Sequence, residues 1–128
     1  MKVSVPISLG ELLDKISILE IKNKKILNES KILNIKKELN DLKKVIDELH
    51  INLSETNGLY DKLYNINLTL WEIEDSIRVL EKNEDFGEKF IELARAVYIT
   101  NDQRFEVKND INKLFNSEYV EEKSYEDY

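Results

Sequence analysis

The sequence contains no cysteine, only one proline and only three glycines, and each shortage excludes a class of protein. Without cysteine there is no disulfide, no thiolate metal ligand and no cysteine nucleophile. So few prolines and glycines leave few places for tight turns, which argues against an all-β fold and against long linkers. The single histidine, His50, leaves no histidine cluster that could bind zinc or iron.

The features of membrane, secreted and nucleic-acid-binding proteins are also missing. No apolar run approaches the roughly 18 residues of a membrane span, and residues 1–10 lack the apolar segment of a signal peptide. The net charge of −7 disfavours nucleic acid as the main partner. We therefore expect a soluble cytoplasmic protein that binds neither membranes nor nucleic acid. Its 128 residues, 41% of them hydrophobic, suffice for one domain with its own core.

Apolar residues recur at helical spacing along most of the chain. Ser8 and Glu11 have the spacing of a capping box, which predicts that the first helix begins at Ser8. The helical stripe of this segment steps by three and four residues through Leu9, Leu12, Ile16, Leu19, Asn23 and Ile26, and Asn23 is its one polar position. Further apolar residues widen the stripe, which indicates more than one neighbouring helix: Leu13, Ile18, Ile21 and Leu27.

Two later segments follow a stricter heptad pattern, which is typical of coiled-coil and bundle seams. The first seam runs through Ile32, Ile35, Leu39, Leu42, Ile46, Leu49 and Leu53. The second seam runs through Leu59, Leu63, Ile66, Leu70, Ile73, Ile77 and Leu80. Beside the second seam lies another stripe, which begins with Tyr60, Tyr64, Asn67 and Trp71.

Turns separate these helices. The second stripe is shifted by two residues from the first, and at ~100° per residue this shift moves it to about the opposite side of a helix. We therefore favour a break at residues 28–30, with Ser30 as the cap, over one continuous helix that is buried on different sides. Residues 54–58 and 83–87 are the next turns, and a last helix extends to about Asn116.

The two ends of the chain differ from the helical body. Residues 1–7 alternate apolar and polar side chains, but Pro6 and the lack of a partner strand favour an extended arm over a strand. Residues 118–128 hold five acids and one lysine, which predicts a mobile acidic tail. The side chains with which this tail can dock are Tyr119, Val120 and Tyr125. The predicted fold class is all-α: an antiparallel bundle of about four helices, as two heptad-seamed hairpins, over residues 1–117.

The apolar stripe of the last helix is interrupted at its middle. The same face that is apolar at both ends holds Asn101, Arg104 and Lys108 between them. Burying Arg104 without a partner would cost several kcal/mol, so it must meet a carboxylate, a ligand or solvent. Other polar residues lie midway along the first and third helices: Glu20, Asn23, Lys24, Glu74, Asp75 and Arg78.

Three interpretations of this polar zone stay open. It is a pocket that binds a small anion or polar metabolite, a satisfied ion-pair network that fixes helix register, or a stretch that turns to solvent. The ligand interpretation rests on the three arginines, which stand among 16 lysines. Arginine is needed mainly where a planar fork must hold a carboxylate or phosphate. The candidate ligand-binding residues are Arg78, Arg104, Lys108, Asn101, Glu74, Asp75, Glu20 and Lys24.

Acid pairs three residues apart are typical of magnesium sites in helical nucleotide pyrophosphatases, and Glu72 with Asp75 is the pair near the polar zone. Such pairs are no more frequent here than the number of acids gives by chance. We therefore expect no cofactor, with Mg²⁺ at Glu72 and Asp75 as the alternative. The sequence assigns no catalytic residue, because three scattered glycines form no phosphate-binding loop and His50 has no serine and acid partners.

Segments from most of the chain resemble a small family of bacterial and phage proteins of unknown function. They read ISLGELLDKISILEIK at 7–22, LWEIEDSIR at 70–78, and FIELARAVYITNDQR at 90–104 with EEKSY at 121–125. The resemblance implies a family but no activity.

The unbroken seams favour a protein that works by association. Four helices within 128 residues cover each other's stripes only in part, and a second copy would cover the rest. We therefore predict a homo-oligomer, most simply a dimer, that acts as a non-enzymatic adaptor or regulator for an unknown protein partner. The alternative is a small helical-bundle enzyme or binding protein for an anionic metabolite or nucleotide.

Overall fold

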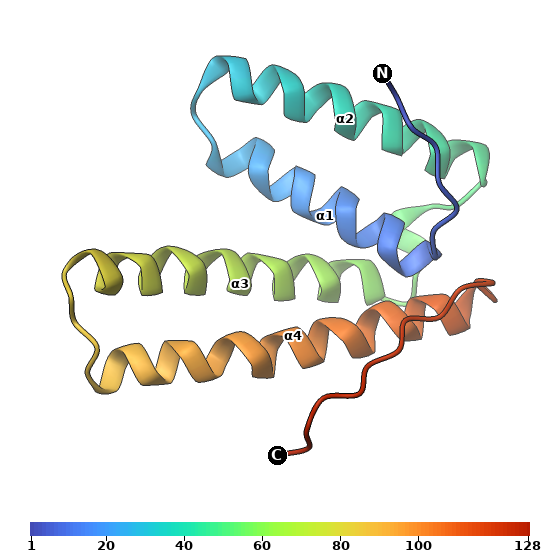
Figure 1. The fold of residues 1–128 in the computed structure, drawn as a ribbon. Coiled ribbons are helices and arrows are strands. Elements are labelled where there is room, and N and C mark those ends of the chain that lie inside the picture. The colour runs from blue at the N-terminus through green and yellow to red at the C-terminus, as the bar shows by residue number, and fades with distance from the viewer.

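The computed structural model describes residues 1–128 as four helices without a strand. The helices are α1 (Leu9–Lys25), α2 (Glu29–Glu48), α3 (Leu59–Lys82) and α4 (Glu88–Leu114), with a short 3-10 turn at Leu53–Glu55. They form two antiparallel hairpins, α1–α2 and α3–α4, which stack with α1 against α3 and α4 (Figure 1). The predicted all-α fold is confirmed. None of the helices has the length and apolar character that crossing a membrane requires.

The first helix begins where the capping-box spacing predicts it. Ser8 Oγ accepts a hydrogen bond from the backbone N–H of Glu11 at 3.1 Å and so caps α1. The Glu11 carboxylate does not return to Ser8, because its Oε2 pairs with Lys108 Nζ of α4 at 2.9 Å. Of the two hydrogen bonds of the predicted capping box, only the one accepted by Ser8 forms, and Glu11 instead makes a contact between α1 and α4. Residues 1–7 form the predicted extended arm, with Lys2 paired to Asp41 of α2 at 3.1 Å.

The chain breaks between α1 and α2 as predicted, but the predicted cap is wrong. Asn28 Oδ1 accepts from the N–H of Lys31 at 3.1 Å, and Ser30 Oγ donates to the same oxygen at 2.7 Å. Asn28 is therefore the cap of α2, and Ser30 only supports it. Because the chain reverses here, the stripes of α1 and α2 face each other instead of lying on opposite sides of one rod.

The core is built around α1, which packs against all three other helices. Leu13, Ile16 and Ile21 of α1 are almost fully buried, as are Leu63 of α3 and Ile111 of α4. The second helix packs chiefly against α1. The wide apolar stripe of the first helix predicted more than one neighbouring helix, and this prediction is confirmed.

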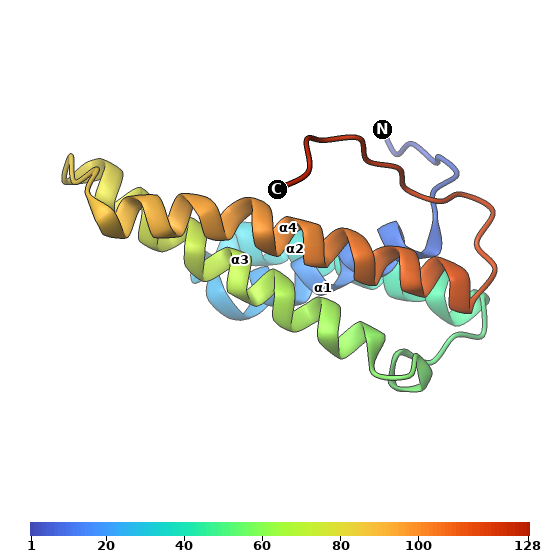
Figure 2. The ribbon, with the colours of Figure 1, turned by 90° about the horizontal axis from the view of Figure 1, so that it is seen from below.

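The α3–α4 hairpin extends beyond the α1–α2 hairpin at the end where both hairpins turn (Figure 2). Its large apolar side chains near the turn are uncovered: Val79, Phe86 and Ile91 are 56%, 54% and 56% exposed. The seam of α3 continues into this end, where Ile77 and Leu80 are only partly buried.

The acidic tail, predicted to be mobile, turns back after α4 and runs along that helix (Figure 1). Lys123 Nζ pairs with Asp102 Oδ1 at 3.2 Å, and Asn109 Nδ2 donates to the Glu121 carbonyl at 3.1 Å. Tyr128 OH donates to Asp102, and this hydrogen bond raises the pKa of Tyr128 to about 12. The side chains predicted for docking remain exposed: Tyr119, Val120 and Tyr125. Polar contacts therefore anchor the tail, together with the Tyr128 ring, which packs edge to face on Tyr98 of α4 with ring centres 5.3 Å apart.

Close approach of α1 and α4 at Gly10 gives a test of this packing. A β-carbon at residue 10 would lie 2.4 Å from the Lys108 carbonyl oxygen and 2.9 Å from Asn112 Oδ1, which accepts from the Gly10 N–H at 2.7 Å. We expect Gly10→Ala to lower the free energy of unfolding in urea by ~1–3 kcal/mol, because the helices must separate. Gly87→Ala is the control, since its β-carbon meets only Asp85 Oδ1 at 3.3 Å. Equal losses in both variants would contradict the close packing.

Candidate functional site

The polar zone centres on the buried carboxylate of Asp14 in α1, which is 1% exposed. Arg104 of α4 holds it with two hydrogen bonds, from Nε to Oδ1 at 3.0 Å and from Nη2 to Oδ2. Asn67 Nδ2 of α3 donates to Asp14 Oδ1 at 2.8 Å. The hydrogen bonds to Asp14 raise the pKa of Arg104, although burial acts in the opposite direction. Side chains from three helices therefore meet at one carboxylate.

Ser17 completes this network. Its hydroxyl donates to the backbone carbonyl of Asp14 at 2.8 Å and accepts the second N–H of Asn67 Nδ2 at 2.8 Å. Ser17 and Asn67 are both buried. The network therefore satisfies its buried groups and fixes α3 against α1.

A second ion cluster surrounds Lys108, whose side chain is 7% exposed. Its Nζ lies 2.9 Å from Glu11 Oε2 of α1 and 2.9 Å from Glu121 Oε2 of the tail. Burial alone would lower the pKa of Lys108, but the hydrogen bonds to Glu121 and Glu11 outweigh it and raise the pKa. Lys108 therefore stays charged and ties α4 to both α1 and the tail.

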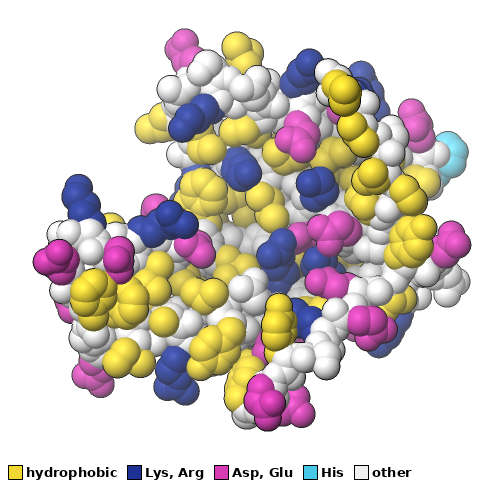
Figure 3. Space-filling model, in the orientation of Figure 1, with side chains coloured by type: hydrophobic (Ala, Val, Ile, Leu, Met, Phe, Trp, Pro, Cys, Tyr) yellow, Lys and Arg dark blue, Asp and Glu magenta, His cyan; other side chains and the backbone are white.

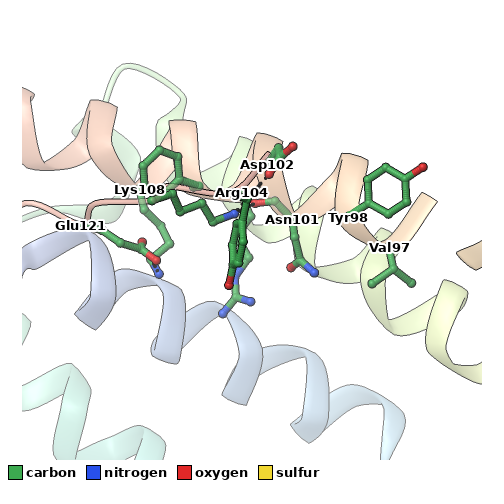
Figure 4. A pocket seen from close by; sticks show the side chains of 10 residues that line it. Val97, Tyr98, Asn101, Asp102, Arg104, Lys108 and Glu121 are labelled. Atoms are coloured by element: carbon green, nitrogen blue, oxygen red, sulfur yellow. Dashed lines mark hydrogen bonds and ion pairs between the residues drawn. The ribbon is translucent and has the colours of Figure 1, made fainter. Parts of the chain in front are cut away.

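Two cavities flank Arg104, and Arg104 and Asn101 line both. The first, about 500 Å³, lies between α1, α3 and α4 and is lined by Ile18, Ile21, Asn67, Leu70, Trp71, Glu74, Asp75, Arg78, Asn101 and Arg104. The second, about 410 Å³, lies between α4 and the tail (Figure 4). In that view Arg104, Lys108 and Asn101 point from α4 toward α1, and Glu121 approaches Lys108 from the tail.

The larger cavity brings together most of the predicted ligand-binding residues. Five of the eight line it: Arg78, Arg104, Asn101, Glu74 and Asp75. Lys108 lines the smaller cavity instead. Glu74 Oε2 pairs with Arg78 Nε at 3.1 Å, whereas Asp75 forms no ion pair. The zone that the sequence placed at mid-bundle is thus partly a satisfied network and partly the wall of a cavity.

Glu20 and Lys24 do not join this zone, so their inclusion in one cluster with Arg104 is corrected by the geometry. The Glu20 carboxylate accepts from Tyr60 OH at 2.5 Å and pairs with Lys43 Nζ at 3.2 Å. Burial, together with this hydrogen bond, raises the pKa of Tyr60. Lys24 Nζ lies 5.3 Å from the centre of the Tyr64 ring. Both side chains therefore serve contacts between α1 and its neighbours α2 and α3.

The predicted metal pair is not assembled at the cavity either. Asp75 lines the larger cavity, but Glu72 is exposed and lines neither cavity. No group of three or more histidine, aspartate or glutamate side chains is placed to hold a metal ion. Any Mg²⁺ at Asp75 would thus depend on oxygens supplied by a ligand.

The sequence did not identify Asp14, Ser17 and Asn67 as members of the site. A local signal existed for Asp14, because it shares a helix face with Ile18 and Ile21 of the widened stripe. Asn67 interrupts the aromatic stripe of α3 in the same way. A polar side chain on an otherwise apolar face must be satisfied by a partner, and here the partners are each other.

A family model described as a family of unknown function (DUF6165) matches residues 1–128. The chain belongs to this family. The resemblance to a family of unknown function is therefore confirmed. No curated protein and no solved structure matches the chain. The function of this DUF6165 protein must therefore be argued from its own surfaces and cavities.

The Asp14–Arg104 pair predicts an unequal response of two arginines of this DUF6165 protein. Arg104→Ala leaves the Asp14 charge buried with only Asn67 beside it, so we expect the free energy of unfolding in urea to fall by ~3–5 kcal/mol. Arg78→Ala is the matched control, because its pair with Glu74 is exposed and is worth at most about 0.5 kcal/mol.

The pair can be separated from the general effect of truncation by a double variant. Asp14→Leu combined with Arg104→Met removes both charges, and we expect it to recover most of the stability that Arg104→Ala loses. Similar losses for Arg104→Ala and Arg78→Ala would show that the buried pair does not hold the bundle together.

Proposed function

We propose that this DUF6165 protein is a non-enzymatic interaction protein, an oligomerising adaptor or regulator, which associates through the free end of the α3–α4 hairpin. The observation that carries the proposal is the exposure of Val79, Phe86 and Ile91 around one turn. Apolar side chains gather on this end of the molecule (Figure 3). A contiguous apolar patch on a protein surface is typical of an interaction site.

The aromatic residues of this end support the same proposal. Phe86 and Phe90 pack edge to face, with ring centres 5.3 Å apart, so Phe86 is held in place before any partner arrives. Large, preorganised aromatic side chains contribute most to binding energy in protein interfaces because little conformational entropy is lost. The partly buried seam residues Ile77 and Leu80 add apolar surface beside them.

The test is the mass of the protein in solution, measured by light scattering. We expect the wild-type protein to have at least twice the 15.1 kDa of one chain. The double variant Phe86→Asp with Ile91→Asp should be a monomer, because association would bury two unpaired carboxylates. Val120→Asp is the control, since Val120 is 50% exposed on the tail, far from the hairpin turn in sequence.

Two results would count against this proposal, one against the contact surface and one against the function. A mass that the Phe86 and Ile91 substitutions leave unchanged would contradict the proposed contact surface. A monomeric wild-type protein that also captures no partner through an intact hairpin end would contradict the proposed function itself.

A second candidate function is supported by the larger cavity: binding of an anionic metabolite or nucleotide. Asp14 uses two of the five N–H donors of Arg104, so further donors remain for an anion beside Asn101. Trp71 offers a ring face on which a planar base can stack. Asp75 can take a cationic group or the Mg²⁺ that accompanies a nucleotide, which would involve the predicted acid without Glu72.

The measurement for this second function is the melting temperature with phosphate, pyrophosphate, or ATP with MgCl₂. We expect at least one probe to raise it, and Arg78→Ala and Asn101→Ala to reduce that rise because both side chains line the cavity. Arg95→Ala is the control, because Arg95 is exposed and lines neither cavity. No rise with any probe, or an equal rise in all variants, would contradict binding at this cavity.

A further inference from the structure

The two hairpins turn on the same side of the molecule (Figure 1). The residues around the two turns carry opposite net charge. The acidic tip, residues 72–92, contains eight acidic and three basic side chains, a net charge of −5. The basic tip, residues 22–37, contains six lysines and one glutamate, a net charge of +5. Because the whole chain has a net charge of −7, the positive charge of the basic tip is a local feature.

Most of these charges have no ion-pair partner within the chain. The ion pairs of the acidic tip are local, Glu74 with Arg78 at 3.1 Å and Lys89 with Glu92 at 3.7 Å. Six acids of the acidic tip are unpaired: Glu72, Asp75, Glu81, Glu84, Asp85 and Glu88. None of the six lysines of the basic tip forms an ion pair. The two tips therefore carry equal and opposite net charge, and they form no ion pair with each other.

Each tip also exposes large apolar side chains among its charges. Leu27 and Leu33 of the basic tip are 87% and 70% exposed, and Phe86 and Ile91 of the acidic tip are more than half exposed. Apolar side chains within a charged rim are the usual composition of a protein interface. Charge alone would indicate only a solvated surface, whereas this combination indicates a contact.

The basic tip adjoins apolar surface between α1 and α3. The surface is notched between the two hairpin ends (Figure 3). Beside the basic tip, a cavity of about 290 Å³ lies between α1 and α3, with Ile21 and Leu68 next to Lys24 and Lys25. A hairpin end that carries exposed apolar residues and acids would meet apolar surface and lysines in this notch.

We propose that a second copy of this chain occupies this notch, with the acidic tip of each copy against the basic tip of the other. The inference rests on the proposed function and names its partner and its surface. A two-fold axis forms the same tip-to-tip contact twice and closes the assembly as a dimer. A second copy is the natural occupant because one chain carries both complementary charges in equal amount.

The charges and the apolar residues have different roles in this dimer. Exposed ion pairs add little affinity each, but opposite fields orient the two copies and speed their association. The apolar side chains supply the affinity. Because the Debye length falls from about 10 Å at 0.1 M salt to about 3 Å at 1 M, association should weaken roughly tenfold over that range.

A charge-swap experiment by sedimentation velocity tests the contact. The first variant reverses the acidic tip with Glu84→Lys, Asp85→Lys and Glu88→Lys. The second reverses the basic tip with Lys24→Glu, Lys25→Glu and Lys31→Glu. Each variant alone should dissociate at least tenfold more readily than the wild type, because like charges then face each other at both contacts.

An equimolar mixture of the two variants should form a dimer again. In the mixed pair the two reversed tips face each other with opposite charge, and so do the two native tips. Native mass spectrometry should detect the mixed dimer and neither parent homodimer. Recovery in the mixture also shows that both variants are folded. The control reverses three exposed acids outside the tips, Asp47→Lys, Glu48→Lys and Glu55→Lys, and should leave the wild-type dimer intact.

The outcomes separate this inference from the proposed function. A wild-type dimer that neither charge reversal weakens overturns the tip-to-tip contact but leaves association through the α3–α4 end in place. Weakening by the lysine reversals alone, without recovery in the mixture, overturns the reciprocal contact and assigns the basic tip to another partner. A wild-type monomer at every concentration overturns the dimer, and the proposed function then depends on a different protein bound at Phe86 and Ile91.

Discussion

The buried carboxylate of Asp14 is the interaction on which the arrangement of the helices depends. An ion removed from water costs several kcal/mol, and that cost is offset only when its partners have good geometry. Here the partners are Arg104 of α4 and Asn67 of α3, so α1, α3 and α4 must meet at one height. Apolar stripes can slide against each other by a turn at modest cost, whereas this carboxylate accepts only one register. The hydrophobic core thus holds the helices together, and Asp14 fixes how they align.

The helices and their breaks follow from local signals, which is why the sequence predicts them well. Periodicity and the Ser8 cap are properties of neighbouring residues, and they survive folding unchanged. The α2 cap was misassigned because Asn28 and Ser30 are both good caps two residues apart. The choice between them depends on where α1 ends, and local propensity leaves that uncertain by a residue or two.

The site was predictable only in part, because its decisive partners are distant in sequence. The interrupted stripe of the last helix identified Arg104 and Lys108, and it required a carboxylate, a ligand or solvent for Arg104. The position of Asp14 on an apolar helix face shows that it needs a partner, but nothing local pairs it with Arg104, which lies 90 residues away. The same holds for Lys108, whose two partners come from opposite ends of the chain, at Glu11 and Glu121. Sequence periodicity indicates that a charged side chain on an apolar face needs a partner, but only the tertiary fold determines which residue is that partner.

Two of the three interpretations of the polar zone turn out to be compatible. The network that satisfies Asp14 leaves donors of Arg104 facing the cavities, so a structural ion pair can also line a binding site. Lys108 differs from Arg104 in this respect. The Glu121 carboxylate of the tail already pairs with Lys108, at the position that an external anion would take. Arg104 therefore lines a cavity with donors left over, whereas Lys108 is already paired with carboxylates of the chain itself.

The helices of the two hairpins differ in length, which leaves one end of the α3–α4 hairpin uncovered. The 27 residues of α4 exceed the 17 of α1 by ten, which is ~15 Å of helix. Since α1 is the helix that joins the two hairpins, α3 and α4 must extend past it at one end or both. The overhang lies at the hairpin turn, where the α3 seam continues through Ile77 and Leu80 without a third helix to cover it. Beyond the end of α1 the α3 seam packs against α4 alone, and the turn that follows exposes Phe86, with Ile91 exposed at the start of α4. The unequal helix lengths therefore explain why this end of the hairpin is the apolar surface that the proposed association uses.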